Sequence, residues 1–285
     1  MSRRAAACAM ALAAMALALL LVQSAGGAAL RLQSLPTHAA FAAKAAQIGS
    51  AEVGPHRAFF DAKRKVALRY RPLAPVPDRV RIRVVRAPSG KVVRHWIETD
   101  LSAGRLQVRR WDGRRADGRV VADGRYRFEL GAPGERMRRA GDFRFHNHRF
   151  PVRGPHQYGD RFGVPRSGGR THEGQDVVAD CGTPLVAARG GRVQARGYSD
   201  SLYGFWVLID GRGTRTDYFY SHLREASPLH TGERVRTGER VGSIGKTGNA
   251  RGEFCQLHFE LWPRGYRHGP PKDPLHALRR WDSFS

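Results

Sequence analysis

The chain has 285 residues, of which 41% are hydrophobic, and a formal net charge of +24 at pH 7. This length suffices for two ordinary domains and the hydrophobic content gives each of them a core, which excludes an intrinsically disordered protein. The charge predicts an anionic partner or a surface that tolerates many cations.

The N-terminus has the pattern of an export signal. Arg3 and Arg4 precede an apolar run from Ala5 to Val22, and small residues follow at 24–28. We therefore expect residues 1–27 to be a cleaved signal peptide. The alternative is an uncleaved anchor, because a run of this length lies near the lower limit for spanning a bilayer. Either way the remainder of the chain is expected outside the cytoplasm, secreted or associated with the cell wall.

An extracytoplasmic location changes the meaning of the charge. The polyanions available there are cell-wall polymers and lipid headgroups rather than nucleic acid. We expect anionic cell-wall polymers as partners, no nucleic acid, and membrane contact only if the signal remains uncleaved. A nucleic-acid or heparin-like polyanion binder, with salt-sensitive binding and no role for a metal, is a rival interpretation that rests on charge alone.

The next two regions differ in pattern. Residues 28–55 are rich in Ala without a strong period, which predicts a linker with a short helix near Ala39–Ile48. From 56 to 150 short β-type runs recur about every ten residues, which predicts an antiparallel β-sandwich. These runs are 66–70, 80–85, 91–97, 106–111, 126–130 and 142–145.

The segment WDGRRADGRVVADGRYRFEL, residues 111–130, is the most specific part of this region. Its three Asp-Gly pairs, at 112–113, 117–118 and 123–124, predict tight turns in which Gly accepts a positive φ. The segment resembles the Ig-like domain of flagellar hook-scaffolding proteins. That resemblance implies a spacer or binding module.

From 151 to 285 Gly-rich loops separate short apolar strands, which predicts a second all-β domain. The expected strands are 184–188, 205–210, 216–221, 240–244 and 255–262. Within this region RTHEGQDVV places His172 four residues before Asp176, in a loop that enters a strand. For this pair alone, a surface ion pair is the simpler interpretation.

Two further histidines lie in expected strands. In EFCQLHFELW, strand alternation puts Gln256, His258 and Glu260 on one face and the apolar residues on the other, although a buried core histidine is the simpler interpretation of His258 alone. In TDYFYSHL, the same alternation groups His222 with Tyr218 and Tyr220, and a surface histidine is the alternative.

Taken together, these motifs resemble the lysostaphin-type (LytM-like) zinc metallopeptidases over roughly residues 160–275. The segments that carry the resemblance are RTHEGQDVVADCGTPLVAARGGRV, YFYSHL, TGERVRTGERVGSIGKTGNARG and CQLHFEL, in that order. The resemblance implies an antiparallel β-rich peptidase domain over 151–285. It also implies that His172, Asp176 and His258 bind Zn²⁺, that His222 is catalytic, and that the substrate is a peptide of bacterial peptidoglycan.

The chemistry of the implied residues agrees with the resemblance, because two imidazoles and one carboxylate leave one tetrahedral position open, as in catalytic zinc sites. One residue departs from the family. Where members usually read His-Leu-His, this chain reads Gln256-Leu257-His258, so a glutamine occupies a catalytic position. Gln hydrogen-bonds but cannot transfer a proton at neutral pH. The alternative to an active hydrolase is therefore an impaired domain that binds peptidoglycan or activates another wall hydrolase.

Three smaller expectations follow. Cys181 lies five residues after Asp176 and Cys255 three before His258, so two strands meeting at one metal would bring the cysteines close enough for a disulfide. Two independent buried thiols are the alternative. Tyr218 or Tyr220 could assist catalysis, and Asp160, Asp210 or Glu260 could contact a zinc ligand. The whole chain is expected to be an all-β, two-domain wall protein.

Overall fold

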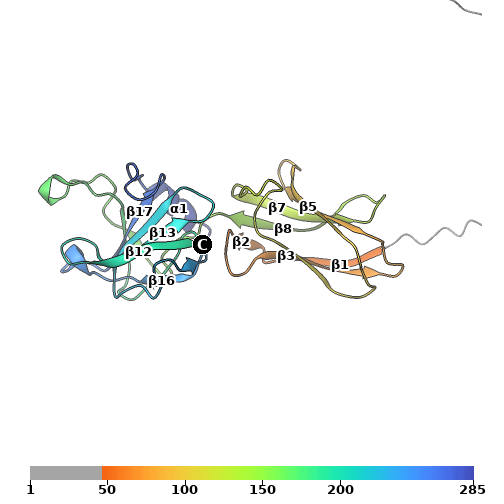
Figure 1. Ribbon diagram of the computed structural model, residues 1–285, viewed down its shortest axis with the longest axis horizontal. Coiled ribbons are helices and arrows are strands. Elements are labelled where there is room, and N and C mark those ends of the chain that lie inside the picture. The colour runs from red at the N-terminus through yellow and green to blue at the C-terminus, as the bar shows by residue number, and fades with distance from the viewer. Residues whose placement is uncertain (1–46) are drawn as a thin grey trace, which may run out of the picture. The chain divides into compact units, whose positions relative to one another are not determined.

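The computed structural model describes residues 47–285, drawn in colour in Figure 1. The expected signal peptide and most of the expected linker lie outside the described residues. Strands dominate, and α1 (Leu275–Asp282) is the one α-helix within residues 47–285. The all-β fold class is confirmed. Among residues 47–285 the structure contains no helix with the length and hydrophobicity that a membrane-spanning segment requires.

The N-terminal β-rich part consists of two sheets, with strand orders β1-β3-β6 and β2-β8-β7-β4-β5. Neighbouring strands are antiparallel except for β2 and β8. Side chains of both sheets share one hydrophobic core that contains Leu68, Trp111 and Phe128, as expected of a sandwich. The strands are β1 (Gln47–Gly54), β2 (Arg57–Phe59), β3 (Val66–Leu73), β4 (Val80–Arg86), β5 (Val92–Glu98), β6 (Gln107–Trp111), β7 (Gly124–Gly131) and β8 (Arg138–His146).

Strand β1 occupies residues that the sequence indicated to be linker. It pairs antiparallel with β3 and buries Ile48 and Val53 in the core. Small and polar residues separate these two apolar side chains, so the local sequence carries no visible alternation. Residues 47–54 are therefore strand rather than linker, because tertiary pairing overrides the weak local pattern.

Two of the three expected Asp-Gly turns are present. Gly113 and Gly118 have φ values of 81° and 79°, in the region that Gly accepts without steric cost. The third expectation, a tight turn at 123–124, is wrong. Gly124 begins strand β7, and the carboxylate of Asp123 accepts a hydrogen bond from the backbone N–H of Asn147 at 2.8 Å instead of closing a local turn.

The C-terminal part is built on a seven-stranded antiparallel sheet with the order β15-β12-β13-β14-β17-β10-β9. A second, two-stranded sheet of β11 and β16 contributes Leu185 and Val241 to the same core. The strands are β9 (Gln157–Tyr158), β10 (Gln175–Val178), β11 (Pro184–Val186), β12 (Gly191–Ser199), β13 (Gly204–Gly211), β14 (Asp217–Leu223), β15 (Arg234–Val235), β16 (Arg240–Ser243) and β17 (Gln256–Trp262).

Candidate metal centre

Strand β17 lies between β14 and β10, so the three strands with expected site residues are direct neighbours. Along β17 the expected alternation is present. Leu257, Phe259 and Leu261 enter the main core of this part, whereas Gln256 and His258 line a pocket on the opposite face of the sheet. Because alternate side chains point to opposite faces of a strand, burial of these three apolar residues turns Gln256 and His258 toward the pocket.

Strand register brings the first two candidate ligands together. Asp176 on β10 lies directly opposite His258 on β17, and His172 is in the loop that enters β10. Gly174 makes this approach possible, because a Cβ on it would lie 2.6 Å from the carbonyl oxygen of Phe259 and 2.7 Å from the His258 ring. The sequence H-x-G-x-D therefore lets the loop fold tightly against β17.

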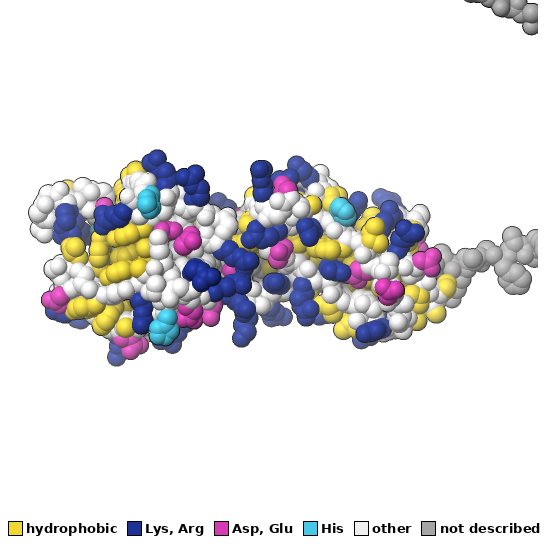
Figure 2. All heavy atoms as spheres, in the orientation of Figure 1, with side chains coloured by type: hydrophobic (Ala, Val, Ile, Leu, Met, Phe, Trp, Pro, Cys, Tyr) yellow, Lys and Arg dark blue, Asp and Glu magenta, His cyan; other side chains and the backbone are white. Residues whose placement is uncertain are grey.

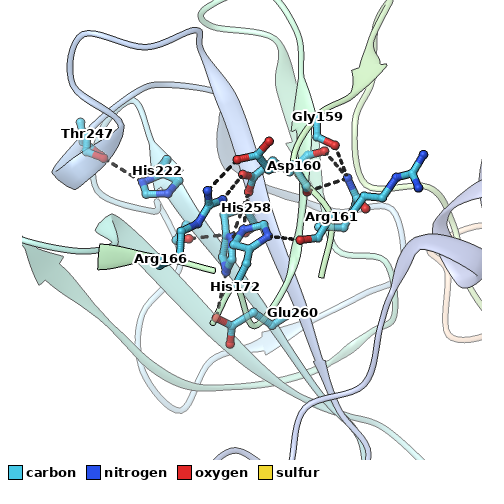
Figure 3. Close-up of polar contacts among 12 residues, drawn as sticks. Gly159, Asp160, Arg161, Arg166, His172, His222, Thr247, His258 and Glu260 are labelled. Atoms are coloured by element: carbon cyan, nitrogen blue, oxygen red, sulfur yellow. Dashed lines mark hydrogen bonds and ion pairs between the residues drawn. The ribbon is translucent and has the colours of Figure 1, made fainter. Parts of the chain in front are cut away.

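Three ligand atoms converge at this point, as Figure 3 shows for the two histidines. His172 Nε2 lies 2.8 Å from His258 Nδ1 and 3.1 Å from Asp176 Oδ1, and His258 Nδ1 lies 3.0 Å from Asp176 Oδ1. Donor atoms around a tetrahedral zinc lie about 3.3 Å apart, so a small expansion would accommodate the ion. Within residues 47–285 this is the one group of side chains arranged to hold a metal.

Each histidine has its other ring nitrogen fixed by an acceptor. His172 Nδ1 donates to the carbonyl oxygen of Arg161 at 2.8 Å, which leaves the lone pair on Nε2 within the cluster. His258 Nε2 contacts Glu260 Oε1 at 2.9 Å, which leaves Nδ1 within the cluster. Such outer contacts set the tautomer of metal-binding histidines.

The electrostatics of the cluster favour a cation. For Asp176, burial raises the pKa, but hydrogen bonds to His172 and His258 outweigh burial and place the pKa well below its ordinary value. For His258, burial lowers the pKa, but contacts with Asp176 and Glu260 outweigh burial and raise it to about 9. At neutral pH Asp176 is thus ionised and His258 is protonated, so the cluster stabilises one positive charge, which a metal ion would replace.

His222 reaches the pocket because of a β-bulge. Phe205 pairs with Leu223 and Val207 with Tyr220, so two residues of β14 oppose one residue of β13. His222 has a φ of 59°, unusual for a residue other than glycine, and its backbone N–H donates to the carbonyl oxygen of Tyr203 at 2.8 Å. The extra residue reverses the side-chain alternation and turns the imidazole toward the pocket.

Because of the bulge, His222 does not share a face of β14 with Tyr218 and Tyr220, so the expected grouping is wrong. Tyr218 and Tyr220 belong to the main core on the opposite face of the sheet. The Tyr220 hydroxyl accepts a hydrogen bond from the Ala188 N–H at 2.8 Å, and the Tyr218 hydroxyl lies 2.7 Å from His148 Nε2. The expectation that one of these tyrosines assists at the site is therefore wrong.

The His222 imidazole lies beside the candidate ligands. Its ring centroid is 5.9 Å from that of His258, and its Nδ1 donates to the carbonyl oxygen of Thr247 at 2.8 Å, as Figure 3 shows. Burial, with a smaller contribution from the charge of His258, lowers the pKa of His222 to about 4. At neutral pH the imidazole is thus uncharged, with the lone pair on Nε2 available.

The pocket has a volume of about 300 Å³ and contains the residues of all three motifs. His172, Asp176 and His258 lie together, and His222 and Gln256 line the same pocket. The structure thus brings together the five residues singled out by the sequence. Gln256 is 9% exposed, so its amide is largely shielded from solvent.

Arg166 is a site residue that the sequence did not indicate. Its guanidinium bonds Asp160 Oδ2 at 2.6 Å and Asp176 Oδ2 at 3.4 Å. The second oxygen of the candidate ligand Asp176 therefore has a cationic partner. The conformation of the loop before His172 places Arg166 there, with its backbone N–H donating to the carbonyl oxygen of Arg170 at 2.9 Å, and the spacing of residues in the sequence does not predict it.

The expected disulfide between Cys181 and Cys255 is present, with the Cα atoms 5.2 Å apart. Cys181 follows β10 and Cys255 immediately precedes β17, so the bond fastens the two strands that carry Asp176 and His258. The crosslink closes a loop with a sequence separation of 74 residues.

Replacing both cysteines with serine is expected to lower the free energy of unfolding by about 4 kcal/mol, because the open chain gains conformational entropy when unfolded. Urea denaturation of the oxidised protein and of the double variant measures the difference. Reduction of the unmodified protein should give the midpoint of the double variant. Identical midpoints for oxidised and substituted protein would show that the bond contributes no stability.

Comparison with known proteins agrees with this geometry. Residues 170–274 match the model of Peptidase family M23. The chain is 29% identical over 142 residues to the L-Ala–D-Glu endopeptidase of Bacillus subtilis, covering 47% of this chain and 43% of the relative. It is 36% identical over 101 residues to the peptidoglycan DD-endopeptidase ShyC of Vibrio cholerae, covering 35% of this chain and 22% of the relative.

Among solved structures, the catalytic domain of lysostaphin from Staphylococcus simulans aligns with a TM-score of 0.39 and 25% identity, over 44% of this chain and 92% of that chain. The chain spans less than half the length of the two curated relatives described above. The match of the family model covers all three candidate ligands, His222 and Gln256. The C-terminal part of this chain therefore carries a domain of peptidase family M23.

Proposed function

We propose that this protein is an exported zinc metalloendopeptidase that hydrolyses peptide bonds of bacterial peptidoglycan. The observation that carries the proposal is the convergence of His172, Asp176 and His258, with ligand atoms 2.8–3.1 Å apart, in a pocket that also contains His222. Two imidazoles and one carboxylate form the donor set of a catalytic zinc site.

His172, Asp176 and His258 would hold the ion through Nε2, Oδ1 and Nδ1. When bound, Zn²⁺ supplies Lewis-acid polarisation of a carbonyl and activation of water. The nitrogens that would bind the ion already face the cluster, since the other ring nitrogens contact Arg161 and Glu260. Binding would displace the proton that His258 Nδ1 shares with Asp176. The ligands are thus oriented before the ion arrives.

His222 is proposed to accept a proton from the water that attacks the peptide bond. Its Nδ1 proton is donated to Thr247, so the free lone pair is on Nε2. A neutral imidazole in this tautomer accepts a proton at Nε2 but cannot donate a hydrogen bond there until it has been protonated. The structure thus favours general-base action over direct hydrogen bonding to a developing oxyanion in the first step.

Gln256 is proposed to orient the reacting groups without transferring a proton. Its amide can donate or accept hydrogen bonds across the pocket that it shares with His222. The same residue supports the second candidate function, a domain that binds peptidoglycan peptides or activates another wall hydrolase. An amide in this position provides binding but no acid or base.

The substrate class follows from the relatives. One is named for cleavage of an L-Ala–D-Glu bond and another as a peptidoglycan DD-endopeptidase. Both names specify an endopeptidase, but they name different peptide bonds as the site of cleavage. The proposal is therefore stated as stem peptides or cross-bridges of peptidoglycan.

The surface charge supports location at a cell wall. Figure 2 shows Lys and Arg side chains over much of the visible face of both β-rich parts, interspersed with fewer Asp and Glu side chains. Outside the cytoplasm such a surface would attract anionic wall polymers, in a manner that weakens with salt. Export itself is proposed from the N-terminal sequence, which lies outside the described residues.

The function is tested by release of soluble peptide fragments from purified peptidoglycan, with and without a chelator. We expect release by the unmodified protein, loss of release with the chelator, and recovery on addition of zinc. Sedimentation of the protein with peptidoglycan is measured in parallel. Binding without release under all metal conditions would support the second candidate function instead.

The contribution of Gln256 is tested with two variants. Q256A is expected to lower the cleavage rate by about tenfold, the effect of losing one oriented hydrogen bond. Q256H is expected to raise the rate above that of the unmodified protein, because an imidazole can also transfer a proton. Rates that are equal in all three proteins would show that this position takes no part in the reaction.

A further inference from the structure

Glu260 is a fully buried carboxylate that the steps above do not use. Its side chain is on β17, two residues after His258 and on the same face of the strand. Burial of an ionised carboxylate is unfavourable unless its oxygens are hydrogen-bonded. Both oxygens are satisfied here, Oε1 by His258 Nε2 at 2.9 Å and Oε2 by the indole N–H of Trp262 at 2.6 Å.

The position of Glu260 excludes it as a fourth ligand of the same cluster. His258 presents Nδ1 to Asp176 and His172, whereas Glu260 contacts Nε2, at the other side of the imidazole. Figure 3 shows Glu260 on the side of the two histidines away from His222. Any effect of Glu260 on an ion therefore passes through the imidazole of His258.

Trp262 fixes the carboxylate in turn. The indole is 2% exposed and packs with Leu208 and Phe219 in a separate hydrophobic cluster. The guanidinium of Arg267 lies 5.3 Å from the centre of the indole ring. Because the indole cannot rotate freely in this packing, its N–H holds Glu260 in the orientation that meets His258.

We propose that Glu260 is a positioning residue for the metal ligand His258, held in place by Trp262. Its carboxylate keeps the proton of His258 on Nε2, directs the lone pair of Nδ1 toward the ion, and makes that nitrogen a stronger donor. The proposal rests on the proposed zinc-dependent function and deepens it. It assigns to β17 a chain of contacts from the ion to His258, Glu260 and Trp262.

A structural role alone predicts a different result. If Glu260 only satisfied a buried hydrogen bond, its replacement would lower the thermal stability of the metal-free protein and leave the zinc affinity of the folded protein unchanged. The deciding readout is therefore the Kd for Zn²⁺, measured by competition with a chromogenic chelator. The melting temperature of the metal-free protein is measured alongside.

Three variants of the full chain are compared. E260Q keeps the shape but removes the charge and leaves one acceptor oxygen for two donors, His258 Nε2 and the Trp262 indole. We expect the Kd for zinc to rise about 10- to 100-fold. W262F keeps the carboxylate and removes its second donor, and we expect a rise of about three- to tenfold. S227A is the control, since the buried Ser227 hydroxyl donates to the carbonyl oxygen of Val241 and lines no part of the pocket.

S227A is expected to lower the melting temperature while the Kd for zinc changes by less than about twofold. Unchanged zinc affinity in E260Q would overturn the positioning role, and if E260Q does not fold, unchanged affinity in W262F would do so. Failure of the unmodified protein to bind zinc would overturn the proposed function as well. Zinc binding with these differences but without peptidoglycan cleavage would leave the role of Glu260 intact and contradict only the peptidase.

Discussion

Replacing His172 with alanine is expected to reduce the rate of peptide release from peptidoglycan to about 0.1% of that of the unmodified protein or less. His172 Nε2 lies within 3.1 Å of both other candidate ligand atoms, so its loss leaves only two donors for the ion. The charge stabilisation that a catalytic metal provides amounts to several kcal/mol, or about three orders of magnitude in rate. Zinc content and cleavage rate are measured on the same preparation.

The matched control is H230A, because His230 is an exposed histidine of the same part of the chain and does not line the pocket. H230A should have the same zinc content and the same rate of peptide release as the unmodified protein. H172A that keeps a full equivalent of zinc would contradict the ligand assignment. H172A that loses zinc but not activity would show that the reaction does not depend on the ion.

Replacing His222 with alanine is expected to lower kcat by a factor of about 10² to 10⁴, the usual contribution of a general acid or base. The zinc content should not change, because the His222 ring lies beside the cluster and donates to Thr247. A lower kcat with unchanged zinc content distinguishes His222 from the metal ligands, because loss of a ligand lowers both kcat and zinc content.

H222Q provides the finer comparison. A glutamine can hydrogen-bond in the pocket but cannot transfer a proton at neutral pH. A rate as low as that of H222A would support proton transfer by His222. A rate close to that of the unmodified protein would show that His222 acts only through a hydrogen bond, and loss of zinc in either variant would make it a ligand.

Strand alternation made much of the β17 face predictable from the sequence. A period of two places Gln256, His258 and Glu260 together whatever the rest of the fold does, and the structure has this arrangement. The meeting of Asp176 with His258 could not be derived in the same way. It depends on the pairing of β10 with β17, across 82 residues, which local periodicity does not encode.

His222 shows the limit of the alternation rule. The sequence grouped it with Tyr218 and Tyr220, which in the structure are in the core on the opposite face. The difference arises from the bulge in β14, and a bulge is a property of the pairing between β13 and β14. The amino-acid sequence of β14 alone does not predict that this strand contains one extra residue relative to β13.

The outer contacts of the ligands were predictable only in part. Glu260 was a candidate because it follows His258 by two residues, but its bond to Trp262 also requires the indole to be packed at the right place. Arg166 was missed because its contact with Asp176, ten positions later in the sequence, depends on the path of the loop between β9 and β10. Such contacts depend on loop conformation and packing, which sequence patterns do not specify.

The zinc content of the purified protein tests the central claim most directly. One equivalent of Zn²⁺ per chain is added to the protein, which is then dialysed against a metal-free buffer. Elemental analysis should afterwards find one zinc per chain in the unmodified protein. It should find almost none when His172, Asp176 and His258 are all replaced by alanine. Zinc absent from the folded, unmodified protein, or retained equally by the triple variant, would contradict the claim that these three side chains hold the ion.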